Sequence, residues 1–190
     1  MKKILILWLL ACVTLLLNSC LNGEEEFWFE RDGSGRLEAE YQLPAFALTS
    51  MGGEDELRKT IEEFFAKEPG VVLDDFTLEK RSAQVVMRIK AHFNSVVELS
   101  SLLKNSAGED GKSLPGPMVE LLGKIKVERQ GMSVDFRRTI DPKGIFGGGL
   151  LSPGAKQLEG YQLQYTMHLP SKVTTSNAHE ILDGGHTVVW

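Results

Sequence analysis

The chain has 190 residues, 42% of them hydrophobic and 25% charged, which is enough for one domain with a hydrophobic core. Its formal net charge of −5 argues against a nucleic-acid partner and against electrostatic docking on anionic lipid. The only cysteines are Cys12 and Cys20, so the rest of the chain is expected to contain neither a disulfide nor a reactive thiolate.

The N-terminus has the parts of a secretion signal. Two lysines precede an apolar run over residues 4–17, which is shorter than the roughly 20 residues that a permanent transmembrane helix needs. The sequence Leu17-Asn18-Ser19-Cys20 resembles a lipobox, in which the cysteine thiol receives a diacylglycerol. We therefore expect residues 1–19 to be a lipoprotein signal peptide and Cys20 to carry the acyl anchor. The alternative is an ordinary cleaved signal followed by a chance cysteine.

Loss of the signal leaves 19 basic and 26 acidic residues, a net charge of −7, so membrane attachment is expected to depend on the lipid. The expected location is outside the cytoplasm, on the cell membrane or the outer membrane. Leu21 follows the cysteine where some lipoproteins have Asp, and by resemblance this favours the outer membrane.

The domain is expected to begin with a β-hairpin. Residues 20–26, which include three consecutive glutamates, are predicted to be a short acidic tether, and residues 27–190 the folded domain. Apolar and polar residues alternate over 27–30 and 36–43, on either side of a glycine-rich turn. This period of two predicts two strands, the second half-buried and ended by Pro44.

A helix is predicted over residues 54–67. Leu57, Ile61, Phe64 and Phe65 form one apolar stripe, and acidic residues occupy the first turn, where the helix dipole favours them. The two phenylalanines are therefore predicted to be buried core residues.

The same order of elements then recurs. Residues 72–79 and 83–93 are predicted to be strands, and a short helix to about residue 104 follows. Ser95 and Glu98 have the spacing of a capping box at the start of that helix. The order strand–strand–helix thus occurs twice, without residue-level identity between the copies.

The last third is predicted to be rich in strands. Residues 123–129 and 132–140 form an expected hairpin, followed by strands at 161–169 and 186–190 and a weak strand at 173–181. The fold class predicted from these elements is α+β, predominantly antiparallel sheet with two helices.

Several segments together resemble the LppM-type lipoprotein domain, a family of largely unknown function. They are the lipobox cysteine, the turn Asp32-Gly33-Ser34-Gly35, the segment Leu169-Pro170-Ser171-Lys172-Val173-Thr174-Thr175-Ser176-Asn177 and the ending Gly185-His186-Thr187-Val188-Val189-Trp190. The resemblance covers residues 20–190. It implies a partly barrel-like α+β domain on the cell envelope, with lipid or glycolipid binding in at least one branch and no catalytic residues.

The sequence offers no recognisable catalytic or metal-binding pattern. None of the four histidines has the helical spacing of a zinc site, and His92 and His168 fall on the polar side of their strands, so they are expected at the solvated surface. Neither Ser34 nor Ser152 lies in a nucleophile-elbow motif. The acidic clusters are interpreted as structural. We therefore expect no enzyme activity, no cofactor and no metal.

One loop is unusually apolar. Ile145, Phe146, Leu150 and Leu151 surround three glycines, and Phe46 and Leu48 lie in a second apolar connector. The loop could be a plug over the core, or a flap that covers a ligand groove or dips into the bilayer. In the second case these six residues are the candidate ligand-binding residues.

The favoured function is a lipid-anchored binding module outside the cytoplasm, which presents an apolar groove to a lipid, a glycolipid or a protein partner of the envelope that the sequence leaves unidentified. The alternative is a structural or assembly lipoprotein with a filled core and no ligand.

Overall fold

The computed structural model describes residues 22–68, 70–82, 84–102, 123–131, 133–140 and 162–190. Their strands form a seven-stranded sheet and a separate two-stranded hairpin. The seven-stranded sheet consists of β1 (Asn22–Phe29), β2 (Gly35–Pro44), β3 (Val71–Arg81), β4 (Gln84–Phe93), β7 (Gln162–His168), β8 (Glu180–Leu182) and β9 (Thr187–Val189). The hairpin consists of β5 (Lys124–Gln130) and β6 (Ser133–Thr139). The helices in these described ranges are α2 (Ala45–Ser50), α3 (Glu54–Ala66), α4 (Val96–Leu102) and the 3-10 turn η2 (Asp183–Gly185).

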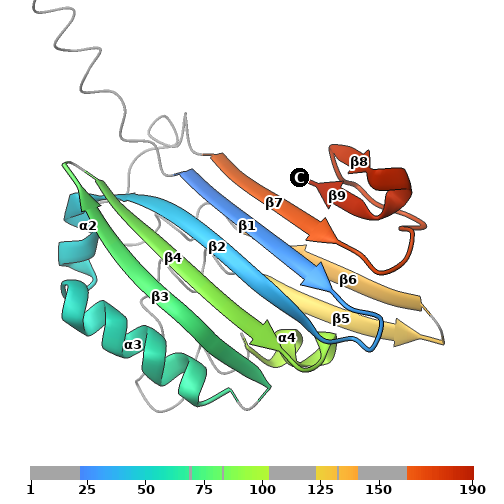
Figure 1. Ribbon diagram of the computed structural model, residues 1–190, viewed down its shortest axis with the longest axis horizontal. Helices are drawn as coiled ribbons and strands as arrows, with labels where there is room; N and C mark the ends of the chain where they lie inside the picture. The colour runs from blue at the N-terminus through green and yellow to red at the C-terminus, as the bar shows by residue number, and fades with distance from the viewer. Residues whose placement is uncertain (1–21, 69, 83, 103–122, 132, 141–161) are drawn as a thin grey trace, which may run out of the picture.

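The strands of the large sheet lie in the order β3-β4-β2-β1-β7-β9-β8. All neighbours are antiparallel except β1 and β7, which run parallel side by side (Figure 1). The α+β class and the dominance of strands are confirmed, but the sheet is mixed, and with β3 and β8 as its edges it does not close into a barrel. The sequence shows where β7 lies but not its partner, because a parallel neighbour must come from a distant part of the chain.

The prediction of a tether is wrong for residues 22–26. Asn22 to Glu26 form the first five of the eight residues of β1, a strand with a neighbour on each side. Glu25 extends the alternation of Phe27 and Phe29 backwards by one step, so strand pairing takes precedence over the local acidic composition.

The turn between β1 and β2 confirms the predicted hairpin. The carboxylate of Asp32 accepts hydrogen bonds from the backbone N–H of Ser34 at 2.9 Å and from its hydroxyl at 2.7 Å. Gly33 has a φ of 93°, which favours glycine. Gly35 has no room for a side chain, since a Cβ atom would lie 2.1 Å from the carbonyl oxygen of Trp28.

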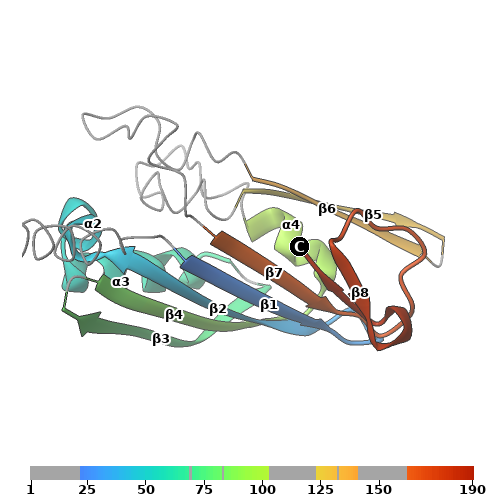
Figure 2. The same ribbon diagram turned by 90° about the horizontal axis from the view of Figure 1, so that it is seen from above.

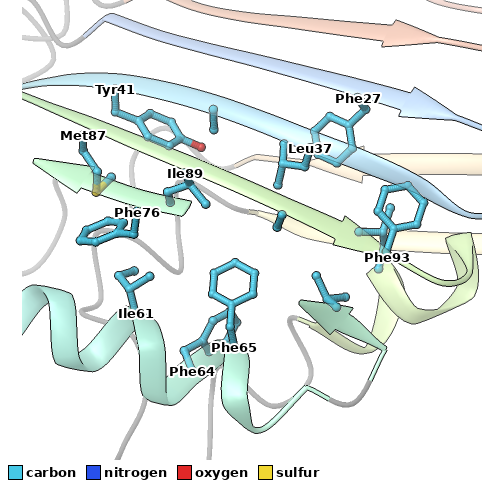
Figure 3. Close-up of a cluster of buried hydrophobic side chains, with 14 of the residues drawn as sticks. Phe27, Leu37, Tyr41, Ile61, Phe64, Phe65, Phe76, Met87, Ile89 and Phe93 are labelled. Atoms are coloured by element: carbon cyan, nitrogen blue, oxygen red, sulfur yellow. The ribbon is translucent and has the colours of Figure 1, made fainter. Parts of the chain in front are cut away.

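Helix α3 covers the side of the sheet that we call the inner face, over β3 and β4 (Figure 3). Leu57, Ile61, Phe64 and Phe65 are all buried there, as predicted. Burial of such large apolar side chains is the main source of stability in a hydrophobic core. The apolar connector after Pro44 is the additional helix α2, so the described ranges contain one α-helix more than expected.

Helix α4 is preceded by Ser95, the predicted capping residue, but the hydrogen bonds of this residue differ from those expected. The hydroxyl of Ser95 accepts a hydrogen bond from the N–H of Val97 at 3.3 Å, while the N–H of Glu98 donates to the backbone carbonyl of Ser95 at 3.0 Å. The Glu98 carboxyl group packs against Gly70, where a Cβ atom would come within 2.0 Å of it. The capping residue is therefore confirmed, but its hydroxyl accepts from a different amide.

The hairpin of β5 and β6 lies on the same side of the sheet as α3 and α4 (Figure 2). Its strands match the prediction to within a few residues. Near the C-terminus the prediction is less accurate, because the weak strand expected at 173–181 is reduced to β8. The chain instead returns through η2 into β9, which pairs with both β7 and β8.

Candidate functional site

A charged pair is buried between the sheet and the hairpin. Glu25 lies on the inner face of β1, in register between Ala39 of β2 and Tyr165 of β7, and is 3% exposed. Arg138 of β6 reaches it from the hairpin, with its side chain 7% exposed. Nη2 of Arg138 donates to Oε1 of Glu25 at 2.9 Å, and Nη1 donates to Oε2. This bidentate geometry is the strongest arrangement available to a guanidinium and a carboxylate.

Two tyrosines complete the polar group. The hydroxyl of Tyr41 donates to Oε1 of Glu25 at 2.6 Å, and the guanidinium carbon of Arg138 lies 4.8 Å from the centre of the Tyr165 ring. The hydroxyl of Tyr165 is buried and makes no hydrogen bond with the described residues. Burial opposes the charged form of Arg138, but the charge of Glu25 and its hydrogen bonds outweigh that effect, so the pKa of Arg138 is raised. Burial raises the pKa of both tyrosines.

Aromatic rings surround this polar group. Phe29 of the sheet and Phe136 of the hairpin meet edge to face with their ring centres 5.9 Å apart. Trp190 packs against Tyr165 at 5.6 Å. Phe29, Phe136 and Trp190 are only partly buried, so apolar surface remains accessible beside the buried charges. We call the set of Glu25, Tyr41, Arg138, Tyr165, Phe29, Phe136 and Trp190 the interlayer cluster.

In the described residues, side chains and not backbone pairing join the two layers. Neither β5 nor β6 pairs through its backbone with a strand of the seven-stranded sheet. The bidentate ion pair and the contact between Phe29 and Phe136 are two such links. Apolar walls with a few placed polar groups are also typical of small-molecule sites. The cluster can therefore hold the hairpin in place and offer a surface to an apolar ligand.

The opposite, outer face of the sheet is polar. On β1 and β2, Glu24 lies opposite Glu40 and Glu26 lies opposite Glu38. Facing like charges destabilise a sheet unless other groups compensate them. Here Glu40 pairs with Arg88 at 2.7 Å, Glu38 with Lys90 at 3.2 Å, and Glu26 with His168 at 2.5 Å. A shallow hollow of about 340 Å³ lies among these side chains.

The two strand histidines lie on this outer face. His92 is exposed and 2.7 Å from Asp74, so its predicted surface position is confirmed. His168 is more enclosed, with 31% of its side chain exposed, and its ring stacks on Trp28 at 5.1 Å between centres. Arg36 lies over the same indole at 4.2 Å. This row of flat groups crosses β2, β1 and β7, next to the glutamates of the same face.

The described residues contain no group of three or more His, Cys, Asp or Glu side chains able to hold a metal ion. None of the helices in the part of the chain that the structure describes is long and apolar enough to cross a bilayer.

Most of the ligand-binding residues predicted from sequence lie outside the described residues. These are Ile145, Phe146, Leu150 and Leu151, and the predicted lipidation residue Cys20 lies outside the described residues as well. Phe46 is on α2, and its side chain is likewise not described. Leu48, on the same helix, is 6% exposed and belongs to the hydrophobic core. The predicted groove formed by these six residues stays a prediction.

Sequence reasoning missed Glu25 and Arg138, although a signal was present. Glu25 shares the strand phase of Phe27 and Phe29, and Arg138 shares that of Phe136. A charge on the apolar side of a strand predicts a buried partner of opposite sign. The acidic run around Glu25 concealed this pattern.

A comparison of the chain with known protein families, with curated proteins and with solved structures finds no match to any of them. The resemblance to the LppM-type domain therefore stays a prediction from the sequence.

Proposed function

We propose that this protein is a lipid-anchored binding module outside the cytoplasm, which presents the apolar surface of the interlayer cluster to a lipid, a glycolipid or an envelope partner. The observation that carries the proposal is the composition of this cluster. Half-buried Phe29, Phe136 and Trp190 lie beside the buried pair of Glu25 and Arg138. A domain without a ligand gains little from such a pair, because well-packed apolar residues of similar volume are often as stabilising or more so.

The sequence supports the membrane part of the proposal. The signal-like residues 1–19 and the cysteine that follows them provide an acyl anchor. A protein held at a lipid surface is surrounded by amphiphiles, whose apolar chains suit aromatic walls and whose polar groups suit a buried hydrogen-bonding group.

Native mass spectrometry of the full chain, purified from membranes in detergent, tests the proposal. We expect a bound lipid in addition to the mass of the acyl anchor. Phe136→Ser should remove that lipid, whereas Val134→Ser, on the same hairpin strand and 51% exposed, should keep it. Circular dichroism of both variants establishes that they are folded. A chain without bound lipid, or equal retention by both variants, would contradict the proposal.

A structural or assembly role is the second candidate, and the position of Leu48 favours it. This residue was expected to line a groove but packs within the continuous core under α2. A protein of this kind acts through its outer surface, so it should carry no lipid beyond its anchor, and the same spectra separate the two functions.

A further inference from the structure

A single residue separates the expected anchor from the sheet. The first strand begins at Asn22, so only Leu21 lies between it and Cys20. Consecutive Cα atoms are ~3.8 Å apart, so the Cα atom of Asn22 lies within roughly 8 Å of that of Cys20 in any conformation of the chain. An acyl group on Cys20 therefore brings the start of β1 to the lipid headgroups.

The sheet register shows which other elements share this end of the molecule. Asn22 lies between Gln42 of β2 and Gln162 of β7. Two residues beyond Gln42, Pro44 leads into α2 and pairs with Gln84 at the turn between β3 and β4 (Figure 1). We call this region the anchor end: Asn22, Pro44, α2, residues 80–82, Gln84 and Gln162.

The opposite end of the sheet lies too far from Cys20 for the single linking residue, Leu21, to bring it to the bilayer. The eight residues of β1 span roughly 26 Å at ~3.3 Å per residue. The turn around Gly33, which follows the last residue of β1, therefore lies at the far end of the sheet.

Charge distinguishes two orientations of the domain, one with the anchor end against the bilayer and one with the outer face against it. The outer face carries four glutamates on β1 and β2, which disfavour contact with phosphate groups although Glu38 and Glu40 also pair with Lys90 and Arg88. The anchor end instead carries Lys80 and Arg81 in sequence, whose side chains are 66% and 52% exposed although each also contacts a glutamate. Exposed basic groups near the bilayer are attracted to lipid phosphates.

From these observations we infer that the anchor end is a docking surface for a phospholipid bilayer, with α2 and the β3–β4 turn against the headgroups. The Gly33 turn and the outer face then point toward solvent. The inference rests on the acyl anchor of the proposed function, and it adds which surface of the domain meets the membrane.

The test uses the processed, acylated full chain in vesicles of phosphatidylcholine and phosphatidylglycerol that contain a headgroup spin-labelled lipid. Ser82→Cys places a fluorophore at the anchor end, and Arg31→Cys places it at the far turn. Both positions are exposed. The acylated Cys20 is the only cysteine that remains after residues 1–19 are removed, so each introduced thiol is labelled alone.

Flotation with the vesicles is measured first and quenching second. We expect both labelled proteins to float, with strong quenching at position 82 and little at position 31. Equal quenching, or stronger quenching at position 31, would overturn the docking surface while the anchor stands. Absence of flotation would overturn the anchor and the docking surface together, so the two failures are distinguishable.

Discussion

Glu25 and Arg138 contribute to the fold in a way that neither could alone. Each is buried, and the bidentate pair with its bond to Tyr41 satisfies both charges. The Coulomb energy of such a pair roughly offsets the cost of removing the charges from water, so the pair itself adds little stability. Loss of one member leaves the other charge buried without its partner.

We therefore expect Arg138→Met to lower the free energy of unfolding by about 3–5 kcal/mol, as measured by urea denaturation. Glu25→Leu in the same chain should restore most of that loss, because the double variant has no unpaired buried charge. Arg137→Met is the matched control. The side chain of Arg137 is 70% exposed, so its replacement should change the free energy of unfolding by less than ~0.5 kcal/mol. An Arg138 variant as stable as the control would show that the pair is not structurally important.

The buried tyrosines predict how stability depends on pH. Burial raises the pKa of Tyr41 and Tyr165 in the folded state above the ordinary value near 10. As the pH rises above about 10, the unfolded chain loses these phenol protons first, so the free energy of unfolding falls. Tyrosinate absorbance from the two residues should therefore appear together with the loss of circular dichroism.

Tyr41→Phe isolates one of these groups. The variant loses a hydrogen bond at every pH, but its stability should decline less steeply above pH 10 because one titrating group is gone. An unchanged slope would mean that Tyr41 ionises at its ordinary pKa in the folded protein.

At the scale of elements, helix α3 and the sheet form the core. The helix places Ile61, Phe64 and Phe65 against β3 and β4, and these side chains meet Phe76 and Met87 (Figure 3). The hairpin of β5 and β6 instead contacts the sheet through the interlayer cluster. The two covers of the inner face thus differ in chemistry, one apolar and the other with charges.

Phe64→Ala or Phe65→Ala should lower the free energy of unfolding by about 3–5 kcal/mol in chemical denaturation. The reason is the loss of buried apolar area together with the cavity that remains. Glu62→Ala, on the exposed side of the same helix, should have an effect of less than ~0.5 kcal/mol. Equal small effects at all three positions would mean that the inner side of the helix is misassigned.

The elements that sequence predicted well have a local signal. Alternation with a period of two predicts β2, β4 and β7, and the apolar stripe predicts α3, because each pattern indicates which side of the element is buried. The parallel pairing of β1 with β7 has no such signal, since it depends on contacts between distant segments. The acidic run hid the start of β1 for a related reason, because the partner that makes Glu25 acceptable lies 113 residues away.

At the scale of the whole molecule, an acidic domain is joined to its expected anchor by one residue. In the proposed arrangement this short connection restricts how the sheet meets the membrane, whereas a long tether would leave the domain free to turn. The candidate site was only partly predictable, since the apolar loop drew attention to residues 145–151 and all members of the described cluster except Trp190 lie on strands. An apolar loop stands out in a sequence, whereas a charge among strand residues does not.

Cys20→Ser should abolish acylation, leave the signal attached and remove incorporation of labelled palmitate. In the proposed lipidation the sulfur of Cys20 receives the diacylglycerol, and a serine hydroxyl cannot replace it. Cys12→Ser is the matched control, because Cys12 lies within the expected signal and should not affect labelling. Persistent labelling of the Cys20 variant would place the acyl group elsewhere.

The most direct test of the binding function is photo-crosslinking in the living cell. A photoreactive amino acid is placed at position 136, within the interlayer cluster, and in a second protein at position 134, on the exposed tip of the same hairpin. Mass spectrometry of the purified protein then identifies what each probe has captured. The account predicts a lipid adduct from position 136 and none from position 134. Equal lipid capture at both positions, or capture at position 136 of only this chain's own residues, would contradict it.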